Sequence, residues 1–142
     1  MSTPAETTEL RRRRTCRRFG WTALLGWAVL GLALEAMHGW KIGGYLDDAL
    51  ARELLVLGHA HGVGLALVVL VFGEAAVPLF GERDDGGASL ALRIGAIVVP
   101  AAFALSAIDH PEGDPNLLVW LVPLGALAVI AALARTAYEA WR

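Results

Sequence analysis

The sequence predicts an all-α integral membrane protein, a four-helix bundle with short loops and up-down-up-down topology. Of its 142 residues, 56% are hydrophobic and only 18% are charged, a composition too apolar for an ordinary soluble domain. It contains four apolar runs, each close to the ~20 residues that a helix needs to cross a hydrocarbon core ~30 Å thick. Apolar residues in these runs are continuous rather than alternating, which predicts helices and not β-strands.

Two parts are expected in the chain. Residues 1–18 are polar and basic, and they are predicted to form a disordered cytoplasmic tail. Residues 19–142 are predicted to form the transmembrane domain. Its expected spans cover approximately residues 19–38, 49–80, 89–108 and 116–137.

Short polar segments separate the predicted spans and carry helix-start signals. Asp47 or Asp48 can cap the second span, and Ser89 can cap the third. The stretch Asp114-Pro115-Asn116 has the pattern of a capping residue followed by a proline in the first helical turn. Each span is therefore expected to begin close to the edge of its apolar run.

Arginine placement predicts the orientation. Six arginines, Arg11 to Arg14 with Arg17 and Arg18, lie directly before the first span, and basic flanks favour the cytoplasmic side. Four spans return the carboxy terminus to that side, so both termini are expected in the cytoplasm. Since the abundance of Ala, Leu, Gly and Arg is typical of a bacterium with a GC-rich genome, we expect a multi-pass protein of the bacterial inner membrane.

The lipid bilayer is the main expected partner. The arginine cluster should attract anionic lipid headgroups, which explains it without a nucleic-acid partner. The sequence contains no phosphate-binding glycine loop, nucleophile elbow or nucleic-acid module. Assembly as a homo-oligomer or as a subunit of a membrane complex remains open. Cys16 is the single cysteine, so no internal disulfide can form.

Polar residues gather at the predicted outer ends of the apolar runs, and ionisable groups there are a functional hypothesis by default. Glu35 and His38 lie three residues apart and share a helix face. His59 and His61 lie between two glycines four apart, a spacing that allows close helix contact. Because residues two apart diverge by roughly 200° on a helix, only one of these histidines should face a given centre. His59 is favoured, since it shares a face with Arg52.

Imidazole and carboxylate groups together are common ligands of Zn, Fe or Cu. The predicted metal ligands are Glu35, His38, His59, His61 and His110. A metal with an open position could support redox or hydrolytic chemistry, but the sequence does not establish an enzyme. One alternative is haem b held by two histidines, although a carboxylate beside the ligands fits an ion better. Another is a non-enzymatic membrane subunit or small transporter whose polar cluster binds a proton, an ion or a partner helix.

An ion pair is predicted at the inner ends of the spans, opposite the polar cluster. Glu74 and Arg93 lie near the inner ends of the second and third spans. These two spans are joined by a short loop and should be antiparallel neighbours. The pair is expected to stabilise the bundle without taking part in function.

Overall fold

The computed structural model describes residues 4–81, 83, 85 and 87–142. In this part of the chain the protein is all-helical, with 84% helix and no strand. The helices are α1 (Pro4–Gly39), α2 (Gly43–Leu46), α3 (Ala49–Phe80), α4 (Ala88–Ser106), the short 3₁₀ helix η1 (Leu117–Trp120) and α5 (Leu121–Ala140). The prediction of an all-α four-helix bundle is confirmed.

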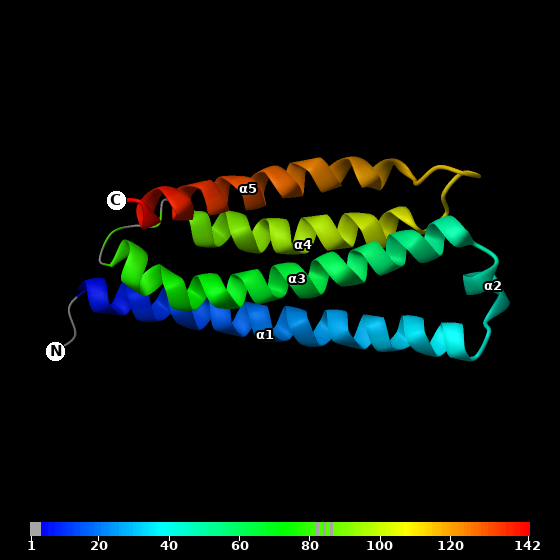
Figure 1. The fold of residues 1–142 in the computed structure, drawn as a ribbon, viewed down its shortest axis with the longest axis horizontal. Coiled ribbons are helices and arrows are strands. Elements are labelled where there is room, and N and C mark those ends of the chain that lie inside the picture. The colour runs from blue at the N-terminus through cyan, green and yellow to red at the C-terminus, as the bar shows by residue number, and fades with distance from the viewer. Residues whose placement is uncertain (1–3, 82, 84, 86) are drawn as a thin grey trace.

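The four long helices are antiparallel and pack in chain order (Figure 1). Helix α3 packs against α1 and α4, and α4 packs against α5. Within the described residues, α1 and α5 make no contact with each other, and α1 contacts α4 only slightly. Both termini lie at one end of the bundle, here named the terminal end, and α2 lies at the opposite α2 end. Because α1 packs closely against α3 alone, grooves remain on both sides of α1.

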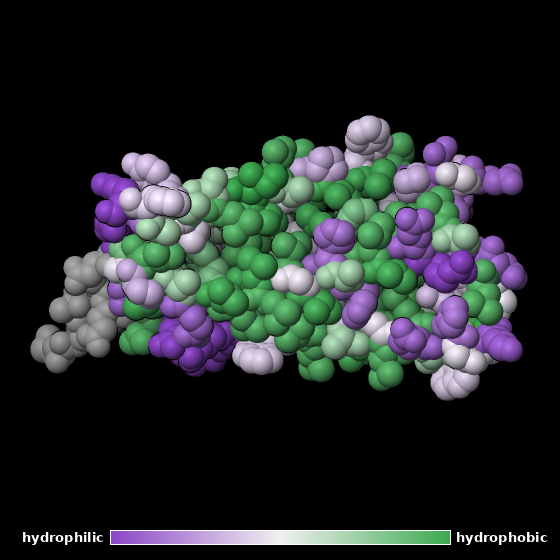
Figure 2. Space-filling model, viewed as in Figure 1, coloured by the Kyte–Doolittle hydropathy of each residue, from purple (hydrophilic) through white to green (hydrophobic). Residues whose placement is uncertain are grey.

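The described residues contain four helices that are long and apolar enough to cross a membrane. They are Thr8–Gly39, Ala49–Phe80, Ala88–Ser106 and Leu117–Ala140. Figure 2 shows apolar surface over the middle of the molecule and polar surface gathered towards both ends. Large apolar side chains such as Leu32 and Val71 are mostly exposed, at 72% and 67%. Exposed apolar surface on this scale is stable when lipid covers it, which supports a multi-pass membrane protein.

Glycines set the distance between neighbouring helices. A Cβ atom at Gly58 would lie 2.9 Å from the backbone oxygen of Pro100 in α4. A Cβ at Gly62 would overlap the Trp27 ring of α1, and one at Gly95 would lie 2.7 Å from the backbone oxygen of Gly125 in α5. Small residues at these places allow close backbone approach, as in other membrane helix pairs.

Helix α1 extends much further than the sequence predicted. Residues 1–18 were expected to be a disordered tail, whereas α1 is continuous from Pro4, and residues 1–3 lie outside the described part. Long-range ion pairs connect this segment to the rest of the bundle. Arg12 Nε lies 3.3 Å from Asp85 Oδ2, and Arg17 Nε lies 2.6 Å from Glu74 Oε1. These contacts anchor the basic segment to the α3–α4 part of the bundle at the terminal end.

The predicted ion pair between Glu74 and Arg93 is wrong. Glu74 instead pairs with Arg13 and Arg17 of α1, while Arg93 Nε donates to the Ser89 backbone oxygen at 3.1 Å. The carboxylate lies on the side of α3 that faces α1, so the ordered arginines of α1 take the place of the expected partner on α4.

The helix-start predictions have mixed outcomes. Asp48 caps α3, because its Oδ1 accepts a hydrogen bond from the Ala51 amide at 2.8 Å. Helix α4 is preceded by Gly87 in a left-handed conformation (φ 81°), without a side-chain cap, so Ser89 is not its cap. The expected cap Asp114 with Pro115 in the first turn is wrong, because Asn116 caps η1 by accepting from the Leu118 amide at 2.9 Å.

Candidate functional site

A groove of about 960 Å³ opens between α1 and α3 towards the α2 end. Its polar lining consists of Glu35 and His38 from α1, Tyr45 from α2, and Arg52, Glu53 and His59 from α3. Aliphatic side chains form the rest of the wall, including Leu32, Val56 and Val63. We name this feature the α1–α3 groove. It brings three of the five predicted metal ligands to one place.

His59 is the most firmly positioned of these residues. Its Nδ1 donates to the backbone oxygen of Trp27 across the helix interface at 2.8 Å. Gly31 makes room for the ring, because a Cβ atom at that position would overlap the imidazole. With Nδ1 carrying the proton, Nε2 keeps a lone pair. The ring is half-buried, and its Nε2 has no hydrogen-bond partner among the residues that the structure describes.

Glu35 and His38 are placed on the last turns of α1. Both side chains are exposed, and neither forms a hydrogen bond or ion pair with any residue that the structure describes. Exposed side chains change rotamer on a picosecond to nanosecond timescale. Their donor atoms can therefore move within the groove, whereas the His59 ring is held in position.

The mouth of the groove carries groups of both charges. Arg52 Nη1 donates to the Leu46 backbone oxygen at 2.6 Å, which ties α3 to α2. Glu53 lies beside it on the groove wall. The sequence interpretation did not assign Glu53 to the site. Helix periodicity could have identified Glu53. Positions 49, 52, 56, 59 and 63 of α3 repeat every three or four residues and form the groove wall, and Glu53 lies at the edge of that wall.

His61 lies on a different face of α3. Its Nδ1 donates to the Leu57 backbone oxygen of its own helix at 2.8 Å. Its ring packs against Phe103 of α4, with 5.0 Å between the ring centroids. The structure thus separates the two neighbouring histidines as helix geometry predicted, with His59 in the α1–α3 groove and His61 outside it.

His110 is also outside the groove. Its Nε2 lies 2.9 Å from Asp48 Oδ2, and its Nδ1 lies 2.9 Å from the Pro111 backbone oxygen. The hydrogen bond to Pro111 and the pairing with Asp48 raise the pKa of His110 above its ordinary value of 6.5. A protonated imidazole has no lone pair for a metal. In this arrangement His110 fastens the loop before α5 to the start of α3.

The His110–Asp48 pair predicts a pH-dependent loop attachment. The raised pKa of His110 gives stability that is complete below pH 6.5 and is lost as the pH rises through that raised pKa. The amide of Ala51 and the ring of His110 lower the pKa of Asp48 below 3.8, so its contribution is lost only as the pH falls through that lower value. Attachment should be strongest between these limits.

NMR titration of the His110 side chain in detergent micelles measures the pKa on which this loop attachment depends. We expect a pKa above 6.5 that falls in Asp48→Asn but keeps part of its increase, because the bond to Pro111 remains. An unshifted pKa in the unmodified protein would contradict the predicted attachment.

Within the described part of the chain, no group of three or more His, Cys, Asp or Glu side chains is already placed to hold a metal ion. What the groove provides is one fixed imidazole nitrogen and two adaptable donors, Glu35 and His38, on the neighbouring helix. Imidazole and carboxylate groups of this kind are common ligands of metal ions. The groove also gives an unpartnered carboxylate at the edge of the apolar region, where charge is costly without a counter-charge.

Comparisons with protein-family models, with curated proteins and with solved structures find no match.

Proposed function

We propose that this chain is a multi-pass membrane protein that binds a transition-metal ion in the α1–α3 groove, through Glu35, His38 and His59. Zn, Fe and Cu are the candidate metals, because imidazole and carboxylate donors suit all three. Three protein ligands would leave a coordination position open, as hydrolytic and redox metal sites require. The proposal covers binding of the ion and leaves any reaction open.

The observation that carries this proposal is the hydrogen bond from His59 Nδ1 to the Trp27 backbone oxygen. Histidines that ligate metals nearly always donate the other ring N–H to a carbonyl or carboxylate, which fixes the tautomer and the ring orientation. His59 already donates its Nδ1 proton to a backbone carbonyl in this way. Its remaining nitrogen belongs to a residue that lines the same groove as Glu35 and His38.

His61 and His110 are left out of the proposed ligand set. His61 lies against Phe103 on another face of α3. Both ring nitrogens of His110 have oxygen partners. These two histidines therefore serve as controls of the same residue type.

We further propose that both termini are cytoplasmic and that the α1–α3 groove opens to the outer side. The two termini share one end of the bundle (Figure 1). Arg11 to Arg14, Arg17 and Arg18 lie at that end, and arginines flanking membrane helices favour the cytoplasmic side. A metal ion would then reach the groove from the outer side.

Elemental analysis and absorption spectroscopy of the chain, purified without chelators and then exposed to each metal, test this proposal. We expect about one ion per chain. His59→Ala and His38→Ala should each weaken binding by at least about tenfold, whereas His61→Ala and His110→Ala should retain it. Gly31→Ala should also weaken binding by about tenfold, because it displaces the His59 ring, and outer-shell changes have effects of this size. Gly64→Ala, where an added Cβ meets nothing, is its control.

Other outcomes would contradict the metal proposal in distinct ways. A Soret band would indicate the haem alternative. Metal loss in His61→Ala with retention in His59→Ala would place the site on another face of α3. A folded protein that binds none of the three metals would favour the non-enzymatic subunit or transporter alternative.

A further inference from the structure

The arginines of α1 fall into two groups. Arg12, Arg13 and Arg17 form ion pairs with carboxylates of the α3–α4 part of the bundle. The others, Arg11, Arg14 and Arg18, have no carboxylate partner among the residues that the structure describes. Their spacing of three and four residues places them along one side of α1. Arg11 and Arg18 each line a cavity between α1 and α4, whereas Arg14 lines neither of these cavities.

A polar pocket of about 220 Å³ lies between α1 and α4 at the terminal end. Its lining includes Arg11, Arg12 and Thr15 from α1, Ser89 and Arg93 from α4, and Asp85 from the segment before α4. We name it the terminal pocket. Among the described residues that line it, three guanidinium groups outnumber one carboxylate.

Arg12 has one buried donor atom without a partner among the residues that the structure describes. The Arg12 side chain is only 6% exposed, and its Nη1 is buried without a hydrogen-bond acceptor in the described part of the structure. Arg12 Nε pairs with Asp85 and Nη2 donates to the Arg83 backbone oxygen at 3.3 Å. A buried donor that stays unpaired is costly. Because Arg12 lines the pocket, an anion there would lie close to its positive charge.

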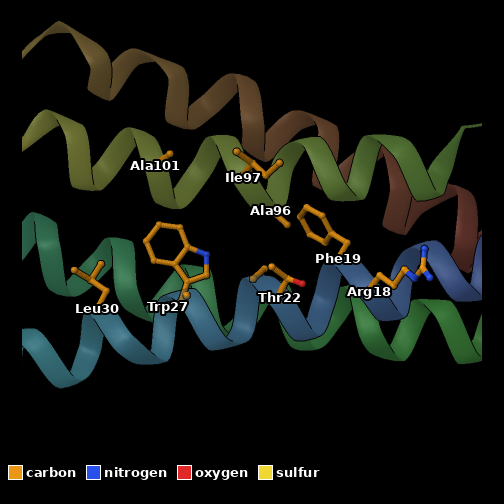
Figure 3. Close-up of a pocket in the computed structure, with 10 residues that line it drawn as sticks. Arg18, Phe19, Thr22, Trp27, Leu30, Ala96, Ile97 and Ala101 are labelled. Carbon is orange, nitrogen blue, oxygen red and sulfur yellow. The ribbon is translucent and has the colours of Figure 1, made fainter.

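An apolar groove of about 630 Å³ continues along the same two helices. Figure 3 shows Phe19, Thr22, Trp27 and Leu30 of α1 facing Ala96, Ile97 and Ala101 of α4, with Arg18 at one end of the row. We name it the α1–α4 groove. On α1 and on α4 alike, the residues that line the terminal pocket lie about one helical turn before the residues that line the α1–α4 groove. Polar pocket and apolar groove therefore form one elongated surface.

The length of this groove matches one leaflet of a bilayer. From Arg18 to Leu30 it follows α1 for about 18 Å, at ~1.5 Å per residue. Half of a hydrocarbon core is about 15 Å. An acyl chain that begins at the membrane surface near Arg18 would therefore run the length of the groove.

We propose that the terminal pocket and the α1–α4 groove together bind one anionic phospholipid, with its phosphate in the pocket and an acyl chain in the groove. The terminal pocket lies at the opposite end of α1 from Glu35 and His38. The α1–α4 groove follows a different face of α1 from the α1–α3 groove, and the lipid proposal does not depend on metal binding. Arg11 and Arg93 supply charge-assisted hydrogen bonds to the phosphate, and Arg12 adds its positive charge. A free phosphate would occupy the pocket and leave the groove unfilled, so the continuity of the two features favours a lipid.

Native mass spectrometry of the full chain, with phosphatidylglycerol and phosphatidylcholine of equal chain length as probes, tests the headgroup contact. We expect phosphatidylglycerol to bind at least tenfold more tightly. Arg11→Gln and Arg93→Gln, which remove no ion pair among the residues that the structure describes, should each weaken its binding by about tenfold. Arg14→Gln makes the same change on α1 outside both features and should weaken binding less than twofold.

A second variant tests the acyl-chain contact. Gly26 lines the groove, and an added Cβ there meets no other atom within 4 Å, so Gly26→Leu should fill the groove without disturbing the fold. We expect about threefold weaker phosphatidylglycerol binding, since apolar contacts within a membrane contribute less than ion pairing. Gly64→Leu, in open space on α3, should have no effect.

Three results would overturn the lipid proposal. Equal binding of the two phospholipids would show that the arginines do not recognise the anionic headgroup. Displacement of phosphatidylglycerol by inorganic phosphate at equal concentration would identify free phosphate as the ligand. A changed oligomeric state in Gly26→Leu, with unchanged lipid binding, would show that a second copy of the chain covers the groove.

Discussion

Gly58→Ala and Gly95→Ala are each expected to lower the free energy of unfolding by about 1–3 kcal/mol, the usual cost of overfilling a packed interior. A Cβ at Gly58 would lie 2.9 Å from the Pro100 backbone oxygen and 3.2 Å from the Ala104 amide nitrogen. Because these are backbone atoms, no rotamer change can make room, and α3 must move away from α4. At Gly95 the obstacle is the Gly125 backbone oxygen of α5 at 2.7 Å.

Unfolding by increasing mole fractions of denaturing detergent, followed by circular dichroism, measures both effects. Gly64→Ala is the matched control within α3, since an added Cβ there has no neighbour within 4 Å. Alanine is the better helix former by about 1 kcal/mol, so the control should be unchanged or slightly more stable. If Gly64→Ala loses as much stability as Gly58→Ala, the loss arises from the glycine substitution itself and not from α3–α4 packing.

The number, order and direction of the long helices could be predicted because each apolar run has the length that a bilayer requires. Partner helices could not be predicted in the same way. Gly58 and Gly62 were expected to share one close contact, but Gly58 faces α4 and Gly62 faces α1. Positions four apart differ by roughly 40° around a helix. That difference is enough to reach two neighbours when α3 lies between them.

The candidate site was predictable only in part. Helix periodicity separated His59 from His61, and the structure places them on different faces. The tautomer of His59 depends on the Trp27 backbone oxygen, which belongs to a helix far away in sequence. Likewise, the attachment of His110 to Asp48 connects residues 62 positions apart. Such contacts depend on how helices are rotated against each other, and hydropathy does not encode that rotation.

The amino-terminal segment shows the same limit, and it gives the second large expected effect. The double variant Glu74→Gln, Asp85→Asn should expose the arginine cluster of α1 to trypsin, with cleavage at least about tenfold faster than in the unmodified protein. Three arginines of α1 lose their carboxylate partners in this variant. The buried pair of Arg12 with Asp85 should contribute most, because loss of one partner leaves a buried charge uncompensated.

Limited proteolysis in detergent, with cleavage sites identified by mass spectrometry, measures this release. The Asp85→Asn change keeps a side-chain oxygen that can accept from the Gly87 amide, as Asp85 Oδ1 does at 3.0 Å, so the start of α4 should be preserved. Glu112→Gln removes an exposed carboxylate at the α2 end and is the control. If cleavage is equally slow in the double variant, helix propensity alone keeps the segment folded. Rapid cleavage would show that its order depends on carboxylates more than fifty residues away, which explains why a basic polar segment was interpreted as a disordered tail.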